Sequence, residues 1–180
     1  MTLIDRDELA TWLQVDIPQA VADQACEMAS GIVSGYTHQH IVAADHVHTL
    51  LVAPSGAVDL PQRPVTAVDR VTVDGDEVAG WTWDGVSPQI RFTPTVAGPS
   101  VTVEYTAGWD PVPRVVKAVA LALAGRSVSN RRGVRSEQLG DYQVTFAGTD
   151  EVIASVVLTK DEKALLDRAV RRGPGTLRQQ

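Results

Sequence analysis

The stretch VVKAVALALA, residues 115–124, constrains the fold of this chain more than any other part of its sequence. It holds one polar side chain, Lys117, and its alternating alanines let neighbouring elements approach closely. A helix that is apolar nearly all round is stable only when most of its sides are buried. A chain of 180 residues can bury one such helix at its centre, and a subunit packed among copies of itself does so easily. Gly125 is predicted to end this helix.

Two helices are predicted ahead of the central one. The first covers residues 3–13, which place several large apolar side chains on one face. The second begins at about Pro18, with Asp16 as its cap, and ends near Gly35. Both would supply apolar surfaces for the central helix to pack against.

A last helix is predicted after the central one. Thr159 and Glu162 have the spacing of a capping box, which indicates a helix from there through about Arg172. Residues 173–180 form a basic tail broken by Gly and Pro, and we expect this tail to be flexible.

Between the second helix and the central helix the pattern changes to short runs rich in Val and Thr, broken by Gly, Pro and Asp. Such runs predict strands and hairpins, and Asp74-Gly75 and Asp84-Gly85 are typical turn pairs. The predicted fold class is therefore α+β, a helical core of about four helices with an antiparallel β module inserted between the second and third helices. The expected divisions are an N-terminal helix pair (1–40), the inserted β module (41–110), the segment that completes the helical core (111–172) and the flexible basic tail (173–180).

Charge is divided unevenly along the chain. Residues 1–110 hold 4 basic and 15 acidic side chains, a balance of −11, whereas residues 111–180 hold 12 basic and 7 acidic ones, a balance of +5. Opposite potentials on one chain favour head-to-tail contact between copies, although two differently solvated faces would give the same count. The net charge of −6 argues against a general coat for nucleic acid.

The four histidines, His38, His40, His46 and His48, lie close together in the sequence. Imidazoles in an His-x-His pair on a strand share one face, and such clusters can bind zinc. No motif with the spacing of a known zinc enzyme accompanies them, so polar loop residues are the favoured interpretation and a metal site is a weak alternative. We expect no metal and no cofactor.

Trp81 and Trp83 alternate on a predicted strand and therefore share a face. Paired tryptophans can form a platform for a ligand such as a sugar, which makes a β-type binding module the alternative function. They can equally cover one side of a small β core, which is the commoner arrangement.

The segment GVRSEQLGDYQVTF, residues 133–146, follows the central helix and lies beside several arginines. Ser136 and Glu137 could be read as a nucleophile and a base, but a serine hydrolase also needs an orienting acid, an oxyanion hole and a strained turn around the serine. No phosphate-binding glycine loop occurs either. We therefore expect no enzymatic activity, and contact with protein is favoured over contact with nucleic acid.

The order of these segments resembles the head-tail connector, or head-to-tail adaptor, proteins of tailed phages, especially those of actinobacterial phages and prophages. The segments that carry the resemblance are residues 105–126 and 133–146. In the first, Tyr105, Gly108, Val112 and Pro113 match the family pattern, and in the second Arg135, Ser136, Glu137, Gly140 and Tyr142 match it. The resemblance covers about residues 3–172 and combines several weak motifs. The basic pair Arg131-Arg132 and the pair His38/His40 depart from the family pattern.

The resemblance implies a structural protein of the virion neck, assembled in the host cytoplasm. Such proteins form a ring, typically of twelve copies, that docks under the portal protein, extends the DNA channel and receives the stopper (head-closure) or tail proteins. Double-stranded DNA would pass through the lumen without sequence-specific binding, and no membrane is involved. The family's C-terminal helix and tail grip the portal. The candidates for contact with neighbouring subunits or the portal are Arg126, Arg131, Arg132, Arg135, Glu137, Tyr142, Arg168, Arg171 and Arg172.

Overall fold

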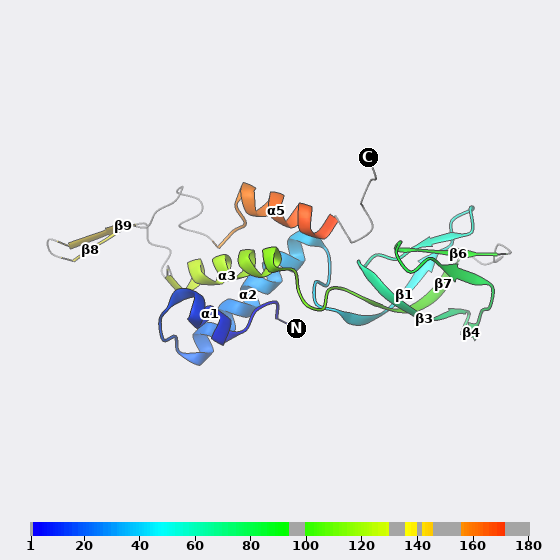
Figure 1. The fold of residues 1–180 in the computed structure, drawn as a ribbon, viewed down its shortest axis with the longest axis horizontal. Coiled ribbons are helices and arrows are strands. Elements are labelled where there is room, and N and C mark those ends of the chain that lie inside the picture. Colours follow the sequence, from blue (N-terminus) through cyan, green and yellow to red (C-terminus); the bar gives the residue numbers. More distant parts are fainter. Residues whose placement is uncertain (1, 94–99, 130–135, 140–141, 146–155, 172–180) are drawn as a thin grey trace. The chain divides into compact units, whose positions relative to one another are not determined.

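The computed structural model describes residues 2–93, 100–129, 136–139, 142–145 and 156–171, and for 136–139, 142–145 and 171 it describes the backbone alone. The chain divides into two units (Figure 1). A helical unit consists of residues 1–37 and 112–169, and a β unit is built on residues 38–111. Each unit has its own set of packed elements.

Four helices occur in the described part of the chain: α1 (Arg6–Leu13), α2 (Gln19–Thr37), α3 (Arg114–Ser129) and α5 (Lys160–Arg171). α1 starts later than predicted because Asp5 caps it. The Asp5 carboxylate accepts a hydrogen bond from the Glu8 amide at 2.8 Å, and the Glu8 carboxylate accepts one from the Asp5 amide at 3.2 Å. Leu3 and Ile4 therefore precede the helix, where the chain bends, and both side chains are buried.

α3 provides much of the core of the helical unit. Its buried residues are Val116, Val119, Ala120, Leu123, Ala124 and Gly125. Gly125 lies within the helix, which continues to Ser129, so the prediction that it ends the helix was wrong. A Cβ atom at Gly125 would lie 3.3 Å from Cδ2 of Leu13, so glycine here allows α1 to pack closely on α3.

α1 and α3 run side by side in the same direction (Figure 1). The Lys117 ammonium donates a hydrogen bond to the Glu8 carboxylate at 2.6 Å, and Leu13 meets Gly125 two turns further along. α2 packs along α3. It ends at Thr37, two residues beyond Gly35, near which its end was predicted. His38 then adopts a left-handed conformation, with φ of 54°, which is a common way to end a helix.

The β unit contains two antiparallel sheets. The first has the order β1 (Ala44–Leu51), β7 (Ser100–Ala107), β3 (Val65–Val73), β4 (Asp76–Glu77), and the second has the order β2 (Ala57–Asp59), β6 (Gln89–Phe92), β5 (Trp81–Trp83). Side chains such as Val71, Ile90 and Val103 form a buried core within this unit. Strands β1–β7 lie between α2 and α3 in the sequence, which confirms the predicted α+β class with an inserted β module.

The two turn pairs behave differently. Asp74 and Gly75 both have positive φ and join β3 to β4 as a two-residue hairpin, as predicted. Asp84-Gly85 instead begins the longer connection between β5 and β6. One oxygen of Asp84 accepts hydrogen bonds from the amides of Val86 and Ser87, at 2.9 and 2.7 Å, and this shapes the loop.

The chain that leaves β7 is hydrogen-bonded to the chain that enters the β unit. The Trp109 amide donates to the carbonyl of Ile41 at 2.8 Å, and the Ala43 amide donates to the carbonyl of Trp109 at 3.2 Å. Gly108 crosses the incoming chain at this point with φ of 117°, and a Cβ atom there would lie 2.7 Å from Cα of Ala43. Glycine is the one residue that this backbone crossing accommodates without displacement.

A hairpin follows α3 in the sequence. β8 (Ser136–Leu139) pairs antiparallel with β9 (Tyr142–Thr145), so that Glu137 faces Val144 and Leu139 faces Tyr142 in the register. The strand at Tyr142–Thr145 was predicted, whereas its partner strand was expected to be loop. None of the described helices combines the length and apolar character that a membrane span requires.

Candidate interaction surfaces

The predicted interface residues fall into three groups. Arg131, Arg132, Arg135 and Arg172 lie outside the described residues. Glu137 and Tyr142 occupy positions in the β8–β9 hairpin, and Arg171 is the last residue of α5. Arg126 and Arg168 are described with their side chains, and they differ in what they contact.

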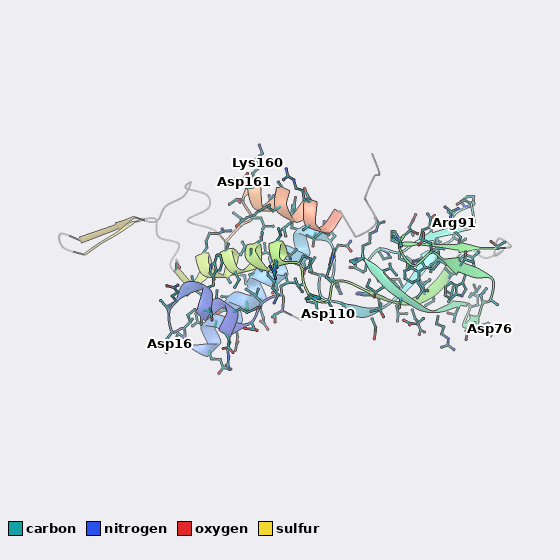
Figure 2. The ribbon with its side chains drawn as sticks, in the orientation of Figure 1. Asp16, Asp76, Arg91, Asp110, Lys160 and Asp161 are labelled. Carbon is teal, nitrogen blue, oxygen red and sulfur yellow. The ribbon has the colours of Figure 1, made fainter. Side chains whose placement is uncertain are left out.

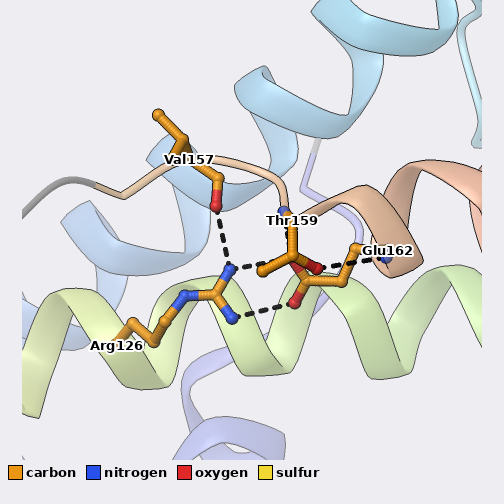
Figure 3. A network of polar contacts seen from close by, with 4 residues as sticks. All are labelled: Arg126, Val157, Thr159 and Glu162. Atoms are coloured by element: carbon orange, nitrogen blue, oxygen red, sulfur yellow. Dashed lines mark hydrogen bonds and ion pairs between the residues drawn. The ribbon is translucent and has the colours of Figure 1, made fainter. Parts of the chain in front are cut away.

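Arg126 ties α3 to α5 within the chain (Figure 3). Its guanidinium donates two hydrogen bonds to the Glu162 carboxylate, at 2.8 and 3.0 Å, and a third to the carbonyl of Val157 at 3.1 Å. The Thr159 amide also donates to Glu162 at 2.8 Å, which completes the predicted capping box of α5. The side chains of Arg126 and Glu162 are 27% and 13% exposed, so most of this pair is shielded from water.

The ion pair changes the acidity of Glu162. Burial raises the pKa of this carboxyl, but hydrogen bonds from Arg126 and Thr159, together with the Arg126 charge, outweigh burial and leave the pKa below its usual range. Glu162 therefore stays ionised at neutral pH, and it serves at once as the cap of α5 and the partner of α3.

α5 is attached to α2 as well. The Tyr36 hydroxyl donates a hydrogen bond to the Asp167 carboxylate at 3.2 Å, and the Lys163 ammonium lies 5.7 Å from the centre of the Tyr36 ring. On its other side α5 presents Lys160, Asp161 and Arg168 to solvent; Figure 2 labels the first two, which point away from the helical unit. The outer face of α5 is thus a mixed-charge surface, and Arg168 belongs to it.

A shallow cleft lies between α1 and α3. It is wide open to solvent, has a volume of about 660 Å³ and is lined by Leu121 of α3 and, on and beside α1, by Asp5, Asp7, Glu8, Thr11, Trp12 and Gln14. Trp12, which lines the cleft, is 55% exposed. On α3, Val115 and Ala118 lie outside the cleft and are exposed as well. The central helix that the sequence predicts to be buried on most sides therefore keeps one open apolar side in a single chain.

Three of the four histidines come together in the β unit. The ring centres of His40 and His46 are 5.0 Å apart, and those of His46 and His48 are 5.9 Å apart. His46 and His48 share the inner face of β1, as the His-x-His spacing predicts, and the His48 ring meets the Tyr105 hydroxyl at 3.1 Å. Within the described residues, no group of three or more His, Cys, Asp or Glu side chains is arranged to hold a metal ion.

His46 is the buried member of this cluster. It is 8% exposed, and its Nε2 atom has no hydrogen-bond partner among the described residues. Burial lowers the pKa of His46, and the neighbouring His40 and His48 lower it further. A hydrogen bond with the backbone of Ala107 and the charge of Asp45 act in the opposite direction without offsetting these effects.

Acidification is expected to destabilise the β unit through His46. Because its pKa in the folded chain lies below the usual value of about 6.5, the unfolded chain binds more protons below that pH, and the free energy of unfolding falls as pH drops through that range. Urea unfolding at about pH 7.5 and about pH 5.5, followed by tryptophan fluorescence, measures the effect. His46→Gln should lose less stability on acidification than the wild type, whereas His38→Gln, which alters an exposed residue, should lose as much. Equal losses in all three proteins would rule out His46 as the source.

The two tryptophans of β5 contact the core of the β unit. Both are partly buried and pack against the buried cluster that includes Ile90 and Phe92. The Trp83 indole also donates a hydrogen bond to the carbonyl of Ser87 at 2.7 Å. Trp81 and Trp83 thus cover one side of the β core, with part of each ring still accessible.

No model of a known protein family matches the sequence, and no curated protein does. Solved structures nevertheless share the fold. A chain of the structure described as "Virion of native gene transfer agent (GTA) particle" matches with a TM-score of 0.57 and 19% sequence identity, over 93% of this chain and 89% of that chain. A chain from the neck of an empty GTA particle, computed with C6 symmetry, gives 0.55 and 18%, covering 77% and 82%. A chain from the neck of a native GTA particle, computed with C12 symmetry, gives 0.52 and 18%, covering 74% and 80%.

Proposed function

We propose that this chain is a structural protein of a virion neck, a head-to-tail adaptor that forms a ring between the portal and the tail. The observation that carries the proposal is the likeness to the virion chain of the gene transfer agent particle, which extends over 93% of this chain and so includes both units. The order of sequence motifs in residues 105–126 and 133–146 supports the same family independently of the structure.

A ring is supported by two further observations. Two of the similar structures are necks computed with C6 and C12 symmetry, in which identical copies are arranged around an axis. In addition, this chain has complementary acidic and basic segments, and a head-to-tail contact closes into a ring only when two different surfaces of the subunit match. We propose twelve copies, with the portal and the stopper or tail proteins as partners.

The proposed ring has no catalytic role. Its net negative charge would oppose tight binding of DNA phosphate and so allow DNA to pass through the lumen. The mixed-charge outer face of α5, including Arg168, together with the predicted contact residues Arg171 and Arg172, is the surface we propose for the portal.

Removing the gene from the phage or prophage that encodes this chain tests the proposal. We expect filled heads without attached tails, and complementation with the wild-type chain should restore complete particles. Electron microscopy of purified particles counts both forms, and quantitative mass spectrometry of complemented particles gives the number of copies relative to the portal protein. Intact necks and tails in particles that lack the chain would contradict the proposal.

A further inference from the structure

The chain enters the β unit through residues 38–43, which we name the entry segment, and few contacts attach this segment to the sheets. The His40 amide donates a hydrogen bond to the side-chain oxygen of Gln62 at 2.7 Å. The Ile41 side chain is 1% exposed, and its carbonyl accepts the hydrogen bond from the Trp109 amide. Burial and hydrogen bonds thus attach the segment to the β unit without making it part of a strand.

The entry segment also contributes one imidazole to the histidine cluster. The His40 ring lies against the His46 ring, with 5.0 Å between their centres, and the His48 ring centre is 5.9 Å from that of His46. The Tyr105 ring lies beside the last two, at 5.5 and 5.7 Å. His40 is exposed and His46 is buried, so the exposed ring of the entry segment contacts the buried ring of the sheet.

The hydrogen bonds of this cluster suit neutral imidazoles. Nε2 of His46 is buried and has no partner among the described residues, so a proton on it would have no acceptor there. The Tyr105 hydroxyl accepts a hydrogen bond from the Gln62 amide at 3.3 Å and can donate its own proton to Nδ1 of His48, 3.1 Å away. A proton on that Nδ1 would displace this donation. Burial raises the pKa of Tyr105, so its hydroxyl stays neutral and offers no balancing charge.

The charges around His46 compensate an added proton poorly. Asp45 precedes it on β1 and therefore belongs to the opposite face of the strand, where its carboxylate accepts a hydrogen bond from the Thr106 hydroxyl at 2.9 Å. The loop that carries Gln62 also carries Arg63, which is exposed and has positive charge. The other two imidazoles of the cluster become positive in acid as well. Like charges at separations of about 5–6 Å disfavour one another.

We propose that His40, His46 and His48 form a proton-sensitive switch: acid shifts the equilibrium towards a form in which the entry segment is detached and the sheets stay folded. His40 is the member that can move, because it lies on the entry segment and is exposed. Its departure relieves the repulsion and admits water to His46. The entry segment connects α2 to β1, so its release lengthens one of the two chain connections between the units. The switch does not depend on the neck function.

Amide hydrogen exchange of the whole chain, measured by NMR at about pH 7.5 and about pH 5.5, tests the switch. Each rate is converted to a protection factor, which removes the intrinsic pH dependence of exchange. The amides of Ala43 and Trp109 report on the entry segment, because both donate hydrogen bonds between it and the chain that leaves β7. The amides of Val78 and Phe92, which donate to carbonyls elsewhere in the β unit, are the reference.

We expect the protection factors of Ala43 and Trp109 to fall about tenfold at the lower pH. An accessible imidazole with the ordinary pKa of about 6.5 is charged about ten times as often as it is neutral at that pH, whereas the buried His46 resists the proton. A low concentration of urea should leave these two factors unchanged, because a local opening exposes little surface. It should lower those of the reference amides, whose exchange requires the sheets to unfold.

Three variants assign the effect to its residues. His46→Gln should abolish the tenfold fall, and His40→Gln, which alters an exposed side chain and leaves the core intact, should make it smaller. His38→Gln, at an exposed position of the same segment, should behave as the wild type. The proposal would be overturned by any of three results: no fall in the wild type, a fall that both His46→Gln and His40→Gln retain in full, or a urea dependence at Ala43 and Trp109 as steep as that of the reference amides.

Discussion

Gly108→Ala is expected to destabilise the β unit by about 3–5 kcal/mol. A side chain at this position meets two obstacles. The backbone has φ of 117°, a conformation that residues with a Cβ atom rarely adopt, and the added Cβ would lie 2.7 Å from the backbone of both Val42 and Ala43. Backbone atoms cannot move aside as the end of a flexible side chain can, so the crossing itself would have to open. The hydrogen bonds between Trp109 and residues 41–43 would weaken with it.

Gly75→Ala is the matched control for this change. Gly75 has φ of 95° and also lies in the β unit, but a Cβ atom there has no neighbour within 4 Å, so the substitution adds backbone strain alone, about 1–2 kcal/mol. Urea unfolding followed by the fluorescence of the β-unit tryptophans compares the two variants with the wild type. Equal losses would show that strain, rather than the contact with residues 42 and 43, decides the effect at Gly108.

Arg126→Ala is expected to destabilise the helical unit by about 3 kcal/mol. The substitution removes three hydrogen bonds and leaves the Glu162 carboxylate, 13% exposed, without the cation that balances it. α5 would lose its main attachment to α3, while the Tyr36–Asp167 bond to α2 would remain. Unfolding by urea, followed by circular dichroism at the helix band, measures the loss.

Two comparisons test whether the charge left on Glu162 causes this loss. The double variant Arg126→Met with Glu162→Gln removes both charges, and it keeps the cap of α5 because glutamine also serves in a capping box. It should be less destabilised than Arg126→Ala, because no buried charge is left without a partner. At acidic pH, the difference in the free energy of unfolding between the wild type and Arg126→Ala should also become smaller. The pKa of Glu162 is lowered in the folded chain, so the stability contributed by its ionised form is present above the usual carboxyl range and is lost as pH falls through the lowered pKa. A double variant less stable than Arg126→Ala would contradict this account.

The helices of the core could be predicted from local sequence, because the apolar spacing and the capping motifs that define a helix involve residues only a few positions apart. The apolar run of residues 115–124 and the Thr159–Glu162 capping box both became the expected elements. α2 ends at Thr37, near Gly35 as predicted, but Gly125 did not end α3. A glycine ends a helix only if the following chain departs from helical geometry, and at Gly125 the demand for space came from Leu13, which is far away in the sequence.

The contacts that define the candidate surfaces had weaker sequence signals. Arg126 and Glu162 are 36 positions apart, and nothing local indicates that an arginine in a basic stretch will pair inside the chain. The spacing of His46 and His48 predicted a shared face, but the approach of Tyr105 from β7 depends on strand pairing. The cleft beside Trp12 required knowledge of how α1 lies on α3.

The crossing at Gly108 has a further consequence for how this chain can vary. Because residues 41–43 are hydrogen-bonded to Trp109, the segment between them begins and ends at one place. Loops inside such a segment can lengthen, shorten or be exchanged without changing the distance between its two ends, which connect to α2 and α3. We therefore expect changes in the loops of the β unit to leave the fold of the helical unit unaffected.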